Sequence, residues 1–145
     1  DLAFILDSSG SVGSYNFQKI KDFVKNVVDF FNIGSSGTHV AVVTYSTYTK
    51  LEFNLKAHHT KSAIKNAVGN INYRGGWTYT ADALDYVRKN IFTTSQVSRL
   101  GRISQLLSRS IFVAFGRIHK ETKSSKKNIF SHFEGSFSQD ILSQR

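Results

Sequence analysis

The chain has 145 residues, enough for one domain with a substantial buried core. It contains no cysteine, which excludes disulfides, thiolate metal sites and cysteine nucleophiles, and no apolar run approaches the roughly 18 residues of a membrane span. The net charge of +9 is uneven: residues 1–96 carry 10 Lys and Arg against 7 Asp and Glu, whereas residues 97–145 carry 9 against 3.

The chain begins with an apolar run, residues 2–6, that predicts a strand buried on both faces of a parallel sheet. The run stops at Asp7, and hydroxyl side chains follow at alternate positions, Ser9 and Ser11. A carboxylate and spaced hydroxyls are hard oxygen donors that suit Mg²⁺, Mn²⁺ or Ca²⁺. The alternative interpretation of this loop is a helix-capping turn after a strand.

A helix is expected next, with Ser14 or Asn16 as its cap. Six apolar residues fall at helical spacing on one face: Phe17, Ile20, Val24, Val27, Val28 and Phe31. The charged residues are expected mostly outside that face: Lys19, Lys21, Asp22, Lys25 and Asp29. A segment rich in glycine and serine, residues 33–37, ends this helix.

Residues 40–45 form a second continuous apolar run and predict another buried strand. Residues 49–55 alternate between apolar and polar side chains, which predicts a half-exposed strand with Leu51, Phe53 and Leu55 on one face. Only three residues separate the two strands. The sequence therefore predicts a hairpin here.

Two shorter helices should follow. Thr60 is the predicted cap of the first, whose apolar face holds Ala63, Ile64, Ala67, Val68 and Ile71. Residues 73–80 form a glycine-containing loop, and the next helix begins at Thr80 or Asp82. Its inward residues are predicted to be Leu84, Val87 and Ile91. This order of elements predicts an α/β fold with a doubly wound, mostly parallel sheet flanked by helices.

The composition changes near residue 96, which predicts a boundary between a domain of residues 1–96 and a basic, serine-rich tail of residues 97–145. Within the tail, residues 111–115 are apolar and fit a further buried strand. Residues 120–127 form a basic run. That run has two interpretations, a binding site for heparin-like polyanions and a solvated, disordered segment.

In a doubly wound sheet, ligands bind beyond the carboxyl ends of the strands. Asp7, Ser9 and Ser11 follow the first strand, and Thr78 lies in a glycine-containing loop that can reach the same crevice. One carboxylate leaves a divalent cation under-neutralised, so we expect the cation to attract an acidic group from a partner protein. Trp77 and Tyr79 flank Thr78 and are the predicted partner contacts, because exposed aromatic residues often anchor interfaces.

These residues carry a family resemblance. Asp7-x-Ser9-x-Ser11, followed by Gly75-Gly76-Trp77-Thr78-x-Thr80, resembles the von Willebrand factor A domain found in integrin inserted domains, matrilins and type VI collagens. The resemblance covers about residues 1–95 and includes the second strand. It implies a metal-ion-dependent adhesion site at four matching positions: Asp7, Ser9, Ser11 and Thr78.

The resemblance also implies a biological role. The domain should bind an extracellular-matrix or cell-surface protein that offers an acidic side chain, through Mg²⁺ or a similar cation, rather than nucleic acid. It should be extracellular, secreted or on the cell surface. No enzyme is expected, because the sequence contains neither the Gly-x-Ser-x-Gly of serine hydrolases nor the Gly-Lys-Ser/Thr of a P-loop.

The chain departs from the family pattern in its second half. Members usually continue with a strand ending in Thr-Asp-Gly, whose Asp completes the metal site, but here Phe115-Gly116-Arg117 offers no carboxylate. We therefore expect residues 97–145 to come from an intron read-through or frameshift in a gene model, or from a diverged splice form. The chain also lacks methionine, which predicts an excised fragment or an incomplete gene product. Two alternatives to cation-dependent binding follow: the chain is an incomplete fragment that binds no partner, or its basic tail binds polyanions.

Overall fold

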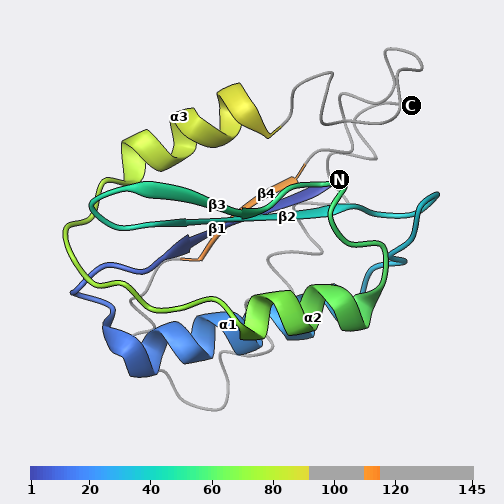
Figure 1. The fold of residues 1–145 in the computed structure, drawn as a ribbon, viewed down its shortest axis with the longest axis horizontal. Helices are drawn as coiled ribbons and strands as arrows, with labels where there is room; N and C mark the ends of the chain where they lie inside the picture. The colour runs from blue at the N-terminus through green and yellow to red at the C-terminus, as the bar shows by residue number, and fades with distance from the viewer. Residues whose placement is uncertain (92–109, 115–145) are drawn as a thin grey trace, which may run out of the picture.

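The computed structural model describes residues 1–91 and 110–114, which form one sheet with helices on both faces (Figure 1). In chain order the elements are β1 (Leu2–Asp7), α1 (Gly13–Asp29), β2 (Val40–Tyr45), β3 (Thr49–Phe53), α2 (Lys61–Gly69), α3 (Thr80–Asn90) and β4 (Ser110–Ala114). α1 and α2 lie on one face of the sheet, and α3 lies on the other (Figure 1). This arrangement confirms the predicted doubly wound α/β fold.

The sheet has the strand order β3-β2-β1-β4. β1 runs parallel to both β2 and β4, whereas β3 is antiparallel to β2. The register pairs Asp7 with Tyr45 and Leu6 with Ala114. β1, β2 and β4 therefore end together, and we call this end of the sheet the carboxyl edge. The loops that follow the parallel strands meet there.

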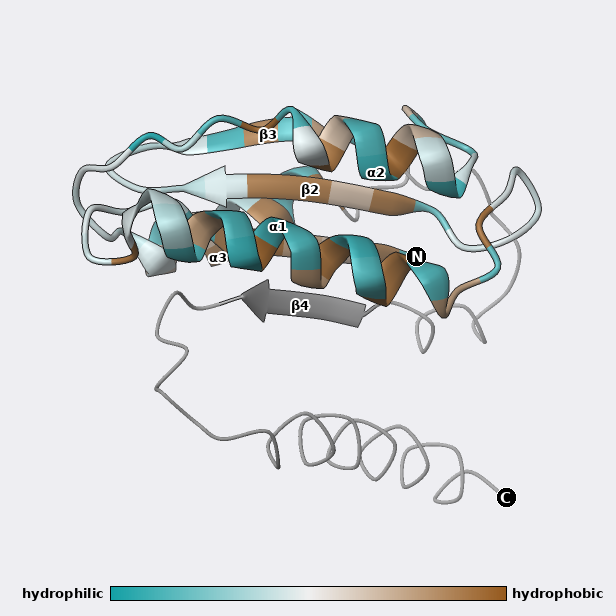
Figure 2. Ribbon diagram, turned by 90° about the horizontal axis from the view of Figure 1, so that it is seen from below, coloured by the Kyte–Doolittle hydropathy of each residue, from teal (hydrophilic) through white to brown (hydrophobic). Residues whose placement is uncertain are grey.

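Two hydrophobic layers cover the sheet because strand side chains alternate between its faces. β1 and β2 are buried along their whole length, and hydrophobic residues occupy most of β2 (Figure 2). The layer beneath α1 and α2 includes Leu2, Phe4, Leu6, Phe17, Val24, Val40, Val42, Ile64 and Val68. The layer beneath α3 consists of Ala3, Ile5, Ala41, Val43, Tyr45, Leu55, Ala83, Val87 and Ile91.

β3 departs from the predicted alternation because it contains a β-bulge. Two adjacent residues of β2 pair with Leu51 and Phe53, so Glu52 is an extra residue on β3. An extra residue reverses the alternation that follows it. Phe53 therefore packs beneath α1 and α2, whereas Leu51 and Leu55 pack on the α3 face. The prediction that these three side chains share one face is wrong.

α1 begins differently from the prediction. Val12 is its N-cap, and no side chain of the described residues caps it. Asn16 lies inside the helix and donates a hydrogen bond from Nδ2 to the Val12 carbonyl oxygen at 2.8 Å. The expected cap at Ser14 or Asn16 is wrong because the chain enters the helix directly from the loop after β1. α2 follows its prediction, since Oγ1 of Thr60 accepts a hydrogen bond from the backbone N–H of Ala63 in the first turn of the helix.

Lys21 was expected outside the apolar face of α1, but its side chain is buried. Its Nζ donates hydrogen bonds to the carbonyl oxygens of Gly69 and Ile71, each at 3.0 Å. Burial lowers the pKa of the Lys21 ammonium, and the positive charge of Lys25 acts in the same direction. The two carbonyls at the end of α2 thus compensate for the burial of a charged group.

α3 begins at Thr80, one of the two predicted starts. Ala83, Val87 and Ile91 are spaced four residues apart and form the buried row that faces the sheet. Leu84 is adjacent to this row in sequence and is 42% exposed. Its predicted inward position is therefore wrong, because a helix turns by 100° per residue and the sheet contacts one narrow row.

β4 confirms the predicted strand near residues 111–115 and ends one residue earlier. The remaining predictions for the second half of the chain, including the basic run and Phe115-Gly116-Arg117, lie outside the described residues. In the described part, α1 is the longest helix, and no helix is both long and apolar enough to cross a membrane.

Candidate metal site

Asp7 is the last residue of β1, and its side chain is buried at the carboxyl edge. Its Oδ1 accepts a hydrogen bond from the backbone N–H of Ser9 at 2.8 Å, which fixes the turn that follows the strand. The side chains of Ser9 and Ser11 meet beside it, with their Oγ atoms 3.1 Å apart. The loop of residues 7–11 thus gathers one carboxylate and two hydroxyls at the predicted position.

The separation of the two serine hydroxyls suits neighbouring ligands of one cation. Oxygen ligands at 90° around an octahedral Mg²⁺, each about 2.1 Å from the ion, lie about 3 Å from one another. The Oγ atoms of Ser9 and Ser11 are 3.1 Å apart. The hydrogen bond between the hydroxyls thus places them at a spacing that is compatible with two neighbouring ligands of one cation.

The donor set of this loop consists of oxygen atoms only. Within residues 1–91 and 110–114, no three or more His, Cys, Asp or Glu side chains are grouped to hold a metal ion. The candidate ligands at the carboxyl edge are the Asp7 carboxylate and serine and threonine hydroxyls. Such ligands fit Mg²⁺, Mn²⁺ or Ca²⁺ better than the Cys and His ligands of typical zinc sites would.

The loop of residues 73–79 is docked against the 7–11 loop by two backbone hydrogen bonds. The N–H of Gly75 donates to the Ser8 carbonyl oxygen at 2.9 Å, and the N–H of Gly10 donates to the Gly76 carbonyl oxygen at 2.8 Å. Two residues further on, Thr78 is exposed. The fold thus brings the segment that carries Thr78 to the loop that carries the other three candidate ligands.

Two adjacent glycines make this docking possible. Gly75 and Gly76 have φ angles of +71° and +91°, which residues with a side chain rarely adopt. A Cβ on Gly76 would also lie 2.5 Å from Oγ1 of Thr47. The sequence places both glycines in a loop, but the close approach of Gly76 to Thr47 in the β2–β3 turn follows only from the structure.

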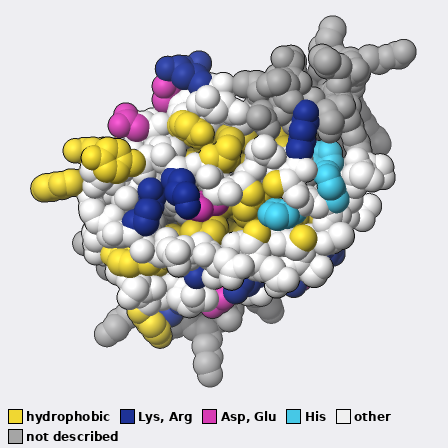
Figure 3. Space-filling model, viewed as in Figure 1, with side chains coloured by type: hydrophobic (Ala, Val, Ile, Leu, Met, Phe, Trp, Pro, Cys, Tyr) yellow, Lys and Arg dark blue, Asp and Glu magenta, His cyan; other side chains and the backbone are white. Residues whose placement is uncertain are grey.

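Trp77 and Tyr79, the predicted partner contacts, are 72% and 48% exposed. Their backbone is anchored to the turn between β2 and β3, residues 46–48. The Trp77 N–H donates to Oγ1 of Thr47 at 3.0 Å, and the Tyr79 N–H donates to the Ser46 carbonyl oxygen at 3.1 Å. In Figure 3, hydrophobic side chains project at the left end of the molecule, where these loops lie, with Lys and Arg side chains beside them.

Tyr45, the last residue of β2, is fully buried. Its hydroxyl accepts a hydrogen bond from Oγ1 of Thr80 at 3.3 Å. Burial raises the pKa of the Tyr45 phenol; the Thr80 hydrogen bond lowers it, and the nearby Asp7 carboxylate raises it further. Tyr45 therefore lines the inner side of the candidate site as a neutral group.

We expect the Tyr45 phenol to keep its proton above pH 10 in the folded chain. The folded state binds this proton more tightly than the unfolded state. The contribution of the protonated phenol to folding stability is therefore complete below the pKa of the unfolded state, and it is lost as the pH rises through the pKa of the folded state. Ultraviolet titration of tyrosinate should show a late step that Tyr45→Phe removes, while circular dichroism confirms that the fold persists. Loss of an early step in Tyr45→Phe would contradict the assignment.

A sequence model of the von Willebrand factor type A domain matches residues 1–116, which includes β4 and extends beyond the residues 1–95 of the motif resemblance. The chain is 38% identical over 92 residues to the collagen alpha-1(XII) chain of Notophthalmus viridescens. It is 38% identical over 117 residues to matrilin-3 of Mus musculus and 40% identical over 101 residues to matrilin-1 of Homo sapiens.

These alignments cover 63%, 81% and 70% of this chain but only 10%, 24% and 20% of the three relatives. The chain thus spans a quarter or less of the length of the proteins that it matches. Matrilins and collagens are non-enzymatic proteins of the extracellular matrix, and their relationship to this chain confirms the expected extracellular location.

Solved structures have the same fold. One of them is proximal thread matrix protein 1 from the mussel byssus, with zinc in its metal-ion-dependent adhesion site (MIDAS) motif. It is 35% identical to this chain at a TM-score of 0.62, and the match covers 67% of this chain and 26% of that one. The manganese-loaded TRAP protein of Plasmodium vivax is 22% identical at a TM-score of 0.56, covering 61% and 37%, and shares the fold. The family match over residues 1–116 and the doubly wound sheet agree. This chain therefore belongs to the von Willebrand factor type A domain family.

Proposed function

We propose that this chain binds other extracellular proteins through a divalent cation, without catalysing a reaction. The proposed ligands are Asp7, Ser9, Ser11 and Thr78. The observation that carries the proposal is the 3.1 Å separation of the two serine hydroxyls beside a buried carboxylate at the end of β1. A related mussel protein with zinc in its MIDAS motif supports a divalent cation in this family.

The charges favour an acidic group on the partner. Asp7, bound directly or through a water molecule, supplies one negative charge, and the hydroxyls of the other three residues supply none. The bound cation would keep net positive charge and attract a carboxylate. α1 and α3 both begin at the carboxyl edge (Figure 1), and the N-terminal end of a helix also favours negative charge.

The aromatic side chains at the same edge supply apolar contact area. Trp77 and Tyr79 are exposed, while their backbone N–H groups are held by the turn between β2 and β3. Binding therefore costs little loop entropy, because the backbone that carries the rings is already ordered. We propose that the partner places an acidic residue on the cation and apolar residues against these two rings.

Titration of the metal-free full chain with Mn²⁺, followed by electron paramagnetic resonance, tests the cation. We expect one saturable site from which Mg²⁺ displaces Mn²⁺ and which a chelator empties. Acetate should then displace water from the bound Mn²⁺, as measured by water-proton relaxation, whereas neutral acetamide should not. This pair of probes isolates the carboxylate chemistry that we propose for the partner.

Two outcomes would reject the proposal in favour of the alternatives. A chain that folds but shows no saturable binding of Mn²⁺, Mg²⁺ or Ca²⁺ would be a non-binding fragment. Matrix-protein binding that survives chelation, weakens with salt and disappears when residues 97–145 are deleted would instead identify polyanion recognition by the basic tail.

A further inference from the structure

We infer that Arg74 and the turn between β2 and β3 form a clamp that positions Thr78 for cation binding. The clamp consists of Arg74, Thr44, Glu52 and the 46–48 turn. None of its side chains is among the proposed ligands, so its members are positioning residues. The inference rests on the proposed function, and it names the part of the fold that controls the affinity of the site.

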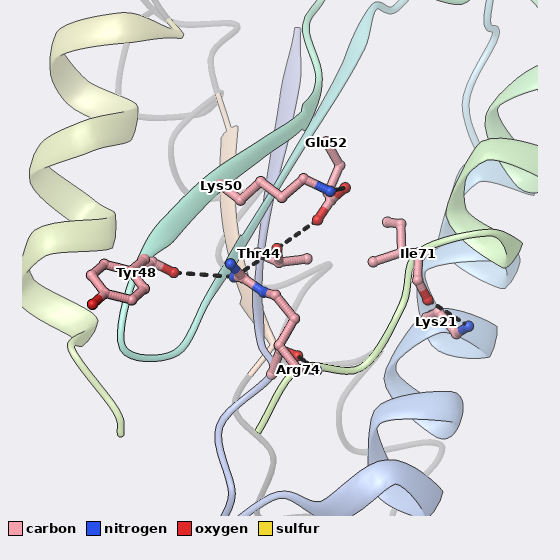
Figure 4. A network of polar contacts seen from close by, with 8 residues as sticks. Lys21, Thr44, Tyr48, Lys50, Glu52, Ile71 and Arg74 are labelled. Atoms are coloured by element: carbon pink, nitrogen blue, oxygen red, sulfur yellow. Dashed lines mark hydrogen bonds and ion pairs between the residues drawn. The ribbon is translucent and has the colours of Figure 1, made fainter. Parts of the chain in front are cut away.

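Arg74 connects three segments that are distant in sequence. Its Nη2 donates hydrogen bonds to Oγ1 of Thr44 at 3.0 Å and to the Tyr48 carbonyl oxygen at 3.1 Å (Figure 4). Its backbone N–H donates to Oγ of Ser8 at 2.9 Å. One residue of the 73–79 loop therefore holds the end of β2, the turn after β2 and the loop after β1 together.

The hydroxyl of Thr44 gives this contact a defined direction. Thr44 has one hydroxyl proton and donates it to Oε1 of Glu52 at 2.7 Å, so its oxygen accepts from Arg74. Lys50 donates to the other carboxylate oxygen, Oε2, at 2.7 Å. The Thr44 hydroxyl is fully buried, and its replacement would leave Arg74 and Glu52 without this shared partner.

The 46–48 turn holds the residues on both sides of Thr78. Oγ1 of Thr47 accepts from the Trp77 N–H, and the Ser46 carbonyl oxygen accepts from the Tyr79 N–H. Gly76 approaches Thr47 so closely that a Cβ there would lie 2.5 Å from Oγ1. The backbone of Thr78 is therefore restrained at its two neighbours, although its side chain is exposed.

Replacing Arg74 should change the cation affinity in opposite directions depending on whether Arg74 acts by positioning Thr78 or by its positive charge. The Arg74 guanidinium is a positive charge on the loop that carries Thr78, so electrostatics alone would let its removal raise cation affinity. Loss of a group that orients a ligand typically lowers metal affinity about 10- to 100-fold. The direction of the change therefore distinguishes the two roles.

The experiment measures Mn²⁺ affinity by electron paramagnetic resonance in variants of the full chain. We expect Arg74→Met and Thr47→Val each to lower the affinity about 10- to 100-fold. Thr47→Ser keeps the acceptor hydroxyl and should retain the affinity of the unmodified chain. Lys50→Met is the matched control, because it removes a positive charge from the same network without contacting the 73–79 loop.

A double-mutant cycle separates positioning from general destabilisation. If Arg74 acts through Thr78, Arg74→Met should have little further effect in a Thr78→Ala background. An equal loss of affinity in both backgrounds, or a higher affinity in Arg74→Met, would overturn the inference.

Trp77, the only tryptophan of the chain, gives a readout that needs no metal. We expect Thr47→Val to lower the fluorescence anisotropy of Trp77 relative to the unmodified chain, because the backbone N–H of Trp77 loses its acceptor. Unchanged anisotropy would overturn the clamp even if the cation binds as proposed. Absence of Mn²⁺ binding together with lowered anisotropy would instead reject the proposed function and retain the clamp as a property of the loop.

Discussion

Asp7→Asn should lower the affinity of the chain for Mn²⁺ by more than about 100-fold, because it removes the one charged group of the proposed ligand set. Loss of a residue that merely orients a ligand costs about 10- to 100-fold, and loss of a charged ligand should cost more. Asparagine keeps an oxygen that can accept the hydrogen bond from the Ser9 N–H. The turn after β1 should therefore persist, and the affinity can be measured by titration with Mn²⁺.

Asp22→Asn provides the matched control for this substitution. Asp22 lies on α1, where its half-exposed side chain pairs with Lys25, and the change should leave Mn²⁺ affinity unaltered. Ser11→Ala gives a second test that avoids the buried carboxylate, since Ser11 is exposed; we expect a smaller loss of affinity with an intact fold. Unchanged Mn²⁺ affinity in Asp7→Asn would show that Asp7 is not part of a cation site.

Phe4→Ala should lower the free energy of unfolding by about 3–5 kcal/mol, the usual cost of truncating a buried phenylalanine. Phe4 lies in the middle of β1, the strand between β2 and β4, and its side chain is fully buried beneath α1 and α2. Its removal loses apolar burial and leaves a cavity that the central strand cannot close by moving. Urea denaturation of the full chain measures the change.

Phe23→Ala is the control for the loss of an aromatic ring. Phe23 lies on α1 and is 38% exposed, so the same substitution should have a much smaller effect on the free energy of unfolding. Equal losses in the two variants would show that the layer beneath α1 and α2 is not the main source of stability. If Phe4→Ala remains folded, its Mn²⁺ affinity should stay close to that of the unmodified chain.

Local pattern was sufficient to predict much of this fold. The apolar runs of β1 and β2 predicted two buried strands, because strands covered on both faces carry no polar alternation. Thr60 predicted the start of α2, because capping depends on a residue and its close neighbours in sequence. The candidate ligands Asp7, Ser9 and Ser11 were identified for the same reason, since their spacing within one loop determines which oxygens can meet.

The clamp, the β-bulge in β3 and the burial of Lys21 depend on contacts between residues that are distant in sequence. The bulge at Glu52 follows from the register of β3 against β2. Lys21 can be buried because the carbonyl oxygens of Gly69 and Ile71 accept hydrogen bonds from its Nζ. Arg74 reads in sequence as an ordinary exposed loop residue. Only the packed sheet brings its guanidinium to Thr44 and the turn after β2, because hydrogen-bond partners separated by about 30 residues are chosen by strand register and loop docking rather than by local pattern.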